Sequence, residues 1–188
     1  MSSFPSGGLA CPWSCSTAVS PDGSHISVLP DETAGGWQAA EHLISLGHRK
    51  VHLFGVPTHL DDPARLTAQV HRRIQSLAKT FRDAGIEAVS VPHEPECWDA
   101  DAGFDTASRA LRDAAPVRAV VALNDAIAAG AYEAFRSVGL RIPEDRSVVS
   151  FDDDIVSFLR PRLSTAALPF EAMGRRAVEL ALDGAAAR

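Results

Sequence analysis

The stretch VRAVVALND, at residues 117–125, carries the strongest indication of how this chain folds. Its apolar run VVAL is continuous, which is typical of a strand covered on both faces, and such strands belong to parallel sheets. Asn124 and Asp125 end the run. Residues 126–138 then have the apolar spacing of a helix, and Gly139 follows where a helix would stop.

The same alternation extends along the chain in both directions. We predict further strands at ISVL, KVHLFG, EAVSVP and RSVVSFDDD, and further helices over residues 33–47, 65–84 and 102–114. Parallel neighbours need a crossover connection, which a helix of ten or more residues provides. The sequence therefore predicts an α/β fold, an open, mainly parallel, Rossmann-like sheet with helices on both faces.

Composition limits the classes of protein that fit. The chain has 188 residues, of which 46% are hydrophobic and 22% charged, a balance typical of a globular domain. Its net charge of -6 argues against direct binding of DNA, which requires a basic face. No apolar run approaches the roughly 20 residues of a membrane span, and we expect no membrane contact.

The cysteines and the N-terminus indicate a cytoplasmic protein. Cys11, Cys15 and Cys97 are too few for a disulfide framework, and Cys11 and Cys15 lack the second pair of ligands that a zinc site needs, so we expect no metal. The first residues have no basic segment followed by an apolar one, as an export signal would. Their Ser, Gly and Pro content predicts a loose tail over residues 1–24.

Polar and aromatic side chains follow the predicted strands. Ligands of open parallel sheets bind outside the carboxyl ends of the strands. Trp98, Asn124 and Asp152 come after three of these ends, and together they offer an apolar plate, a mixed donor and acceptor, and a carboxylate. That set suits a polyhydroxylated or heteroaromatic small molecule. Asn124 or Asp125 could instead cap the following helix, and Trp98 could be a core aromatic.

Catalytic patterns do not fit this chain. It has no G-x-S-x-G elbow, P-loop, G-x-G-x-x-G or H-E-x-x-H, and we expect neither an enzyme nor a cofactor. A phosphoacceptor receiver domain would need a lysine after a late strand, whereas the lysines are Lys50 and Lys79. An α/β hydrolase would need a nucleophile with a base in reach, and no such pair is evident at the predicted rim.

Four segments resemble LacI/GalR-type transcriptional regulators. They are DETAGGWQAAEHLISLGHRKVHLFG, RIQSLAKTFRDAGI, VVALNDAIAAGAYEAFRSVGLRIPEDRSVVSFDDD and RPRLSTAALPFEAMGRRAVELAL. The resemblance implies a periplasmic-binding-protein-like domain whose two lobes close around a small effector, in most cases a sugar or a nucleobase. It implies effector contacts by Arg73, Trp98, Asn124 and Asp152. Ser76, Leu77 and Ser150 depart from the family pattern, and the loop before Arg73 leaves Arg65 or Arg72 as possible substitutes.

The resemblance also implies how the chain is divided. Residues 25–168 are expected to form one effector-binding lobe. Residues 169–188 are expected to form a crossover and a helix that belong to the first lobe. The rest of the first lobe and the helix-turn-helix headpiece have no counterpart here. The stretch 163–169 resembles the chain crossing back to that lobe. The full-length family forms homodimers. A fragment of a transporter-type sugar-binding protein is the alternative, although it should carry an export signal.

Overall fold

The structure is a computed structural model that describes residues 15–19, 26–58, 67–91, 98–112, 117–154 and 158–186. Its strands are β1 (Cys15–Val19), β2 (Ile26–Pro30), β3 (Lys50–Phe54), β4 (Glu87–Val91), β5 (Ala119–Ala122), β6 (Ser147–Asp152) and β7 (Ser164–Ala167). Its helices are α1 (Glu32–Ser45), α2 (Ala68–Asp83), α3 (Ala100–Ala110), α4 (Asp125–Ser137) and α5 (Phe170–Ala186).

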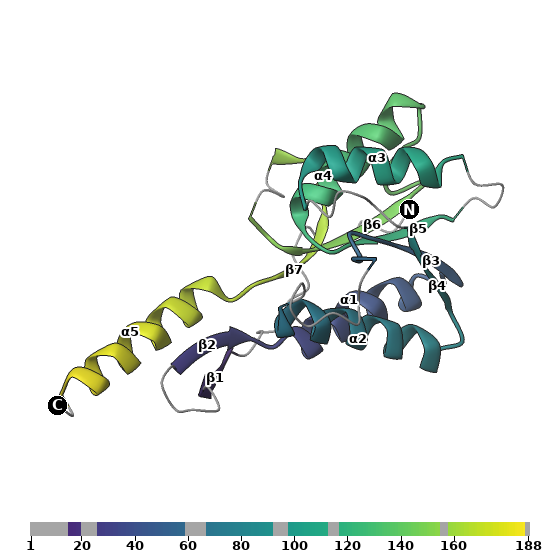
Figure 1. The fold of residues 1–188 in the computed structure, drawn as a ribbon. Helices are drawn as coiled ribbons and strands as arrows, with labels where there is room; N and C mark the ends of the chain where they lie inside the picture. Colours follow the sequence, from purple (N-terminus) through teal and green to yellow (C-terminus); the bar gives the residue numbers. More distant parts are fainter. Residues whose placement is uncertain are drawn as a thin grey trace.

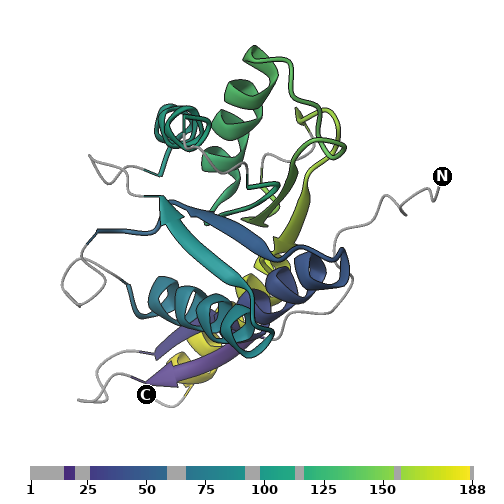
Figure 2. The ribbon, with the colours of Figure 1, turned by 90° about the vertical axis from the view of Figure 1, so that its right-hand side faces the viewer.

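Five strands form one parallel sheet in the order β4-β3-β5-β6-β7. Helices α1 and α2 cover one face and α3 and α4 the other, as Figures 1 and 2 show. Successive side chains of a strand point to opposite faces. Accordingly Val121 packs in the core with α1 and α2, and Val120 in the core with α3 and α4. The predicted α/β fold is confirmed, and this double burial explains the apolar run in β5.

Polar side chains begin the four helices that flank the sheet. Asp31, Thr67, Asp99 and Asn124 each accept a hydrogen bond from a backbone N–H in the first turn of α1, α2, α3 and α4. Such a bond satisfies one of the N–H groups that a helix start leaves without a partner. Helix α4 begins three residues after the end of β5, next to the carboxyl edge of the sheet.

Helices α3 and α4 approach each other through two glycines. A Cβ atom built on Gly103 would lie 2.1 Å from the carbonyl oxygen of Ile127, and one on Gly130 would lie 1.8 Å from that of Ala100. Neither position has room for a side chain. This contact sets the separation of the two helices and thereby the position of the α4 N-terminus.

The fifth strand, β7, was not predicted. Residues 163–169 were expected to be a crossover, but Ser164–Ala167 pairs in parallel with β6, and Ala166 is buried in the core. STAA is short and made of small residues, so it has no apolar alternation to identify it as a strand. Its pairing with β6 is a tertiary contact.

The N-terminal strands β1 and β2 form a second sheet. Cys15–Val19 pairs with Ile26–Pro30 in an antiparallel two-stranded sheet, so the prediction of a loose tail over residues 1–24 is wrong for β1. The backbone groups of β1 find their partners in β2, which sequence composition did not indicate. β2 was predicted as a strand, yet it joins β1 rather than the five-stranded sheet. The other residues of 1–24 lie outside the described ranges.

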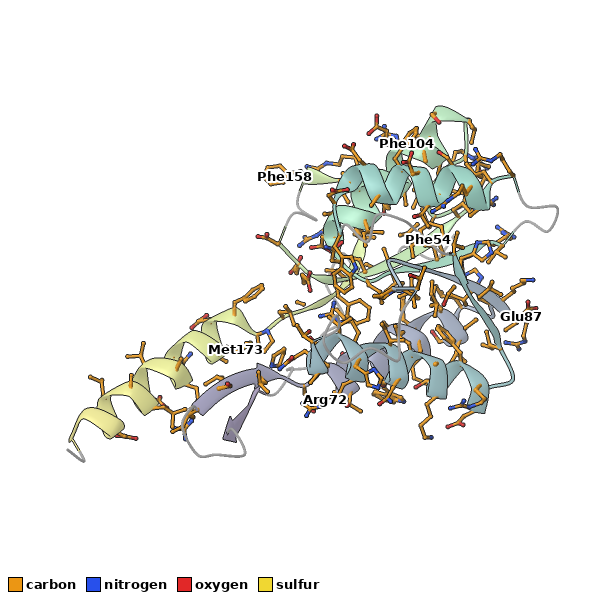
Figure 3. All side chains as sticks on the ribbon, in the orientation of Figure 1. Phe54, Arg72, Glu87, Phe104, Phe158 and Met173 are labelled. Atoms are coloured by element: carbon orange, nitrogen blue, oxygen red, sulfur yellow. The ribbon has the colours of Figure 1, made fainter. Side chains whose placement is uncertain are left out.

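Helix α5 projects from the sheet and lies beside β2 (Figures 1 and 3). Its apolar residues include Met173, Ala177, Leu180 and Ala181. Met173 and Leu180 are half-buried, whereas Ala177 and Ala181 are exposed. Phe170, Val178 and Leu182 keep 56%, 59% and 66% of their surface accessible.

Candidate functional site

The carboxyl edge of the sheet brings together the residues singled out in the sequence. β5 ends at Ala122, followed by Leu123 and Asn124, and the neighbouring β6 ends at Asp152. Arg73 reaches the same edge from α2, where its Nη1 donates to the carbonyl oxygen of Leu123 at 2.5 Å and its Nη2 to Asp152 Oδ1 at 3.4 Å. We define this group, with Glu32 and Trp98, as the edge cluster.

Arg73 is held by a carboxylate that the sequence analysis did not consider. Its Nε donates to Glu32 Oε2 at 2.6 Å and its Nη2 to Glu32 Oε1 at 2.9 Å, and both side chains are 4% exposed. The guanidinium carbon also lies 4.3 Å from the ring centre of Phe151. Arg73 is therefore fixed in place by groups from α1, from β6 and from Leu123, the residue directly after β5.

Of the two substitutes considered for Arg73, Arg72 is exposed on α2 (Figure 3), and Arg65 lies outside the described residues. Adjacent residues of a helix point about 100° apart, and on α2 Arg73 is buried whereas Arg72 is exposed. The structure therefore brings Arg73, not Arg72, into the edge cluster.

Asp152 ends β6 in an unusual backbone conformation. Its φ is +95° and that of Asp153 is +63°, a region that Asp and Asn adopt more readily than most residues. The side chain of Asp152 is 26% exposed. Loss of solvent raises the pKa of Asp152 to about 6; Arg73 opposes this rise, and the neighbouring carboxyl groups of Asp125 and Glu32 add to it.

Asn124 caps α4 and also holds the loop that carries Trp98. Its Oδ1 accepts from the Ile127 N–H at 2.8 Å, and its Nδ2 donates to the carbonyl oxygen of Trp98 at 3.0 Å. The capping alternative raised for Asn124 therefore describes a bond that the structure contains. Trp98 is half-buried and packs against both core clusters, so its ring also contributes to the core.

Asp125 connects the first turn of α4 to β6 and β7 through hydrogen bonds. It is 2% exposed, and its carboxylate accepts hydrogen bonds from the Ser150 hydroxyl, from the Thr165 hydroxyl at 3.3 Å and from the Asp154 N–H at 2.8 Å. The last bond supports the turn that follows Asp152. Ser150 is one of the departures from the family pattern, and this departure was the signal in the sequence for a polar contact here.

The sequence analysis missed Glu32 because an acidic residue at its position predicts only a favourable charge at a helix N-terminus. It follows Asp31 at the start of α1, where acidic residues commonly favour the helix N-terminus without any further role. Asp31 alone makes the capping bond, accepting from the Ala34 N–H at 3.0 Å. Glu32 is then free to turn toward Arg73, which lies 41 residues further along the chain.

Within the described ranges, no group of three or more His, Cys, Asp and Glu side chains is arranged to hold a metal ion. Among the helices of that same part of the chain, none is both long enough and apolar enough to cross a membrane.

Comparisons with known proteins agree with this architecture. A family model for a periplasmic binding protein-like domain matches residues 40–187. The solved LacI family transcriptional regulator from Enterococcus faecium with bound ribose has a TM-score of 0.68 and 29% identity over 81% of this chain and 54% of its own. The Lac repressor bound to ONPG has a TM-score of 0.69 and 28% identity over 81% of this chain and 44% of its own. The fold is thus that of a periplasmic-binding-protein-like domain.

Curated relatives define the family more closely. The HTH-type transcriptional regulator MalR of Streptomyces coelicolor is 35% identical over 83% of this chain and 44% of its own length. The ribose operon repressor of Escherichia coli is 29% identical over 85% of this chain and 46% of its own. The chain belongs to the family of LacI/GalR-type transcriptional regulators, and it spans less than half the length of these relatives.

Proposed function

We propose that this chain is a ligand-sensing part of a LacI-type transcriptional regulator and that a small sugar is its effector. The observation that carries the proposal is the edge cluster itself, in which Arg73 contacts Asp152 and the Leu123 carbonyl while Asn124 contacts the Trp98 backbone. Open parallel sheets bind ligands at this edge. The ribose bound by the regulator from Enterococcus faecium supports a sugar as the class of ligand.

Each residue has a distinct role in this proposal. Asp152 accepts hydrogen bonds from sugar hydroxyls, and the ring of Trp98 provides an apolar surface for a sugar face. Asn124 fixes the loop of Trp98 relative to α4 and offers its remaining N–H to the ligand. Arg73 positions Asp152 and the Leu123 carbonyl, and its hydrogen bonds to the described residues leave one Nη1 hydrogen for a ligand oxygen.

In this proposal the effector changes the affinity of a dimeric regulator for its operator. DNA contact belongs to a headpiece, not to this chain, and the protein acts in the cytoplasm without catalysing a reaction. Such coupling requires two states with different affinity for the ligand. A single lobe on its own binds weakly and transmits no signal, so micromolar affinity of this chain for a sugar would contradict this part of the proposal. The regulators among its relatives favour this function over a transporter-type sugar-binding protein.

The test is an NMR titration of the labelled chain with ribose, galactose and lactose. We expect one of these sugars to shift the backbone amide signals of Trp98, Asn124 and Asp152. Asp152→Asn should weaken binding at least about tenfold, because a hydrogen bond to a charged group contributes roughly 1.5–3 kcal/mol. Asp153→Asn, which removes the same charge from an exposed neighbour, should bind as the wild type does. Shifts confined to other surfaces would refute the assignment of the site.

A further inference from the structure

The charge of Arg73 is compensated before any ligand arrives. Glu32 occupies Nε and one hydrogen of Nη2, Asp152 lies on the other side of Nη2, and the Leu123 carbonyl takes one hydrogen of Nη1. A guanidinium has five N–H donors, and four are used by these contacts. A guanidinium has two edges that can grip a phosphate or carboxylate with two parallel hydrogen bonds: Glu32 fills the Nε/Nη2 edge, and Asp152 takes the Nη2 hydrogen of the other.

The carboxyl groups around Arg73 outnumber it. Glu32 and Asp152 both contact Arg73, so two carboxyl groups face one guanidinium, and the carboxyl group of Asp125 also acts electrostatically on Asp152. Glu32 and Arg73 are both 4% exposed, and charges in such surroundings are screened by water much less than surface charges are. An anionic ligand at this edge therefore meets a negative field and finds no free bidentate donor.

We propose that Glu32 determines the charge selectivity of the edge cluster: by neutralising Arg73, it restricts the site to neutral polyhydroxylated ligands and excludes phosphorylated and carboxylated sugars. This inference rests on the proposed function, since it describes the ligands of the same site. Glu32 acts through Arg73 and is a positioning residue; it does not itself touch the ligand. Without its carboxylate, Arg73 would present a cation with two parallel N–H donors, which is the arrangement that binds phosphate.

The first experiment compares ribose with ribose 5-phosphate on the wild-type chain by NMR titration. We expect ribose to shift the edge-cluster amides and ribose 5-phosphate to bind at least about tenfold more weakly, which is the effect of one unfavourable charged contact. Equal or tighter binding of ribose 5-phosphate would overturn the inference and leave the proposed function standing. This comparison needs no variant.

The second experiment uses inorganic phosphate as the probe and Glu32→Gln as the variant. The glutamine keeps an oxygen that can accept from Arg73 but removes the charge, and we expect phosphate to bind this variant at least about tenfold more tightly than the wild type. The matched control is Glu41→Gln, which removes an exposed charge from the same helix nine residues further on, roughly 13 Å along its axis. Glu41→Gln should leave phosphate binding unchanged.

The outcomes separate the two proposals. Gain of phosphate binding by Glu32→Gln but not by Glu41→Gln supports the charge selectivity, even if no neutral sugar binds the wild type and the proposed function fails. The same gain in both variants, or in neither, overturns it. Glu32→Ala serves as a second variant if Glu32→Gln does not fold. Unfolding of both would also overturn the inference, because Glu32 would then serve the fold and not selectivity.

Discussion

Replacement of Asp152 by asparagine should make the folded chain more stable at neutral pH. Burial of the Asp152 carboxyl group away from water raises its pKa from 3.8 to about 6, although Arg73 acts in the opposite direction. A group with a raised pKa in the folded state binds its proton more tightly there than in the unfolded state. The stability that this proton contributes is fully present below pH 3.8 and is lost as the pH rises through about 6.

The magnitude follows from the two pKa values. The difference between 3.8 and about 6, at about 1.36 kcal/mol per pKa unit, gives at most roughly 3 kcal/mol. Asparagine has no such proton to lose, keeps an oxygen for Arg73 and tolerates the positive φ of this position. The free energy of unfolding of the wild type should therefore fall relative to that of Asp152→Asn between about pH 4 and pH 7.

Urea unfolding at a series of pH values measures this difference directly. Asp153→Asn is the matched control, because Asp153 is the exposed next residue and also has a positive φ. Its stability should follow that of the wild type across the whole range. Parallel curves for Asp152→Asn and the wild type, or the same divergence in the control, would refute the argument that burial of Asp152 opposes its ionisation.

Three further predictions test the framework around the site. Gly130→Ala should lower the free energy of unfolding by about 1–3 kcal/mol, because its Cβ would meet the Ala100 carbonyl. Gly174→Ala, whose Cβ would meet open space on α5, should raise the free energy of unfolding by up to about 1 kcal/mol. Similar urea midpoints for the two variants would contradict this prediction. Asn124→Ala should cost about 1 kcal/mol and speed hydrogen exchange at the first-turn amides of α4, and unchanged exchange would argue against its capping role. Burial raises the pKa of Tyr132, the one tyrosine of the chain. Ultraviolet titration should therefore detect its phenolate only once the chain unfolds. Ionisation near pH 10 in the folded chain would disprove this.

Much of the fold could be predicted because many of its strands and helices have recognisable local sequence patterns. The apolar run of β5 and the helical spacing of α1, α2 and α4 identify elements without any knowledge of their partners. Their alternation then requires parallel pairing, because a crossover helix returns the chain in the same direction. The strands β1 and β7 could not be predicted in this way, since neither segment has a periodic pattern that distinguishes it from a loop. β2 was predicted as a strand, but its pairing with β1 was not.

The candidate site could be predicted in part. Asn124 and Asp152 directly follow strands, so the rule for parallel sheets assigns them to one edge before any coordinates exist. The rule does not say which neighbours these residues contact. Asn124 turned out to bond with the Trp98 backbone and with α4, and Asp152 to lie beside Arg73.

The sequence by itself determined the alternation of strands and helices from β3 to β6, their parallel pairing and the edge where polar residues collect, because each depends on spacing between near neighbours. Only the tertiary structure decided that Glu32 compensates Arg73 and that Asp125 binds Thr165, residues that are 41 and 40 positions apart. Contacts of that kind depend on where packed helices and strands place their side chains. No local pattern encodes such a pair, and the charge of the site follows from it.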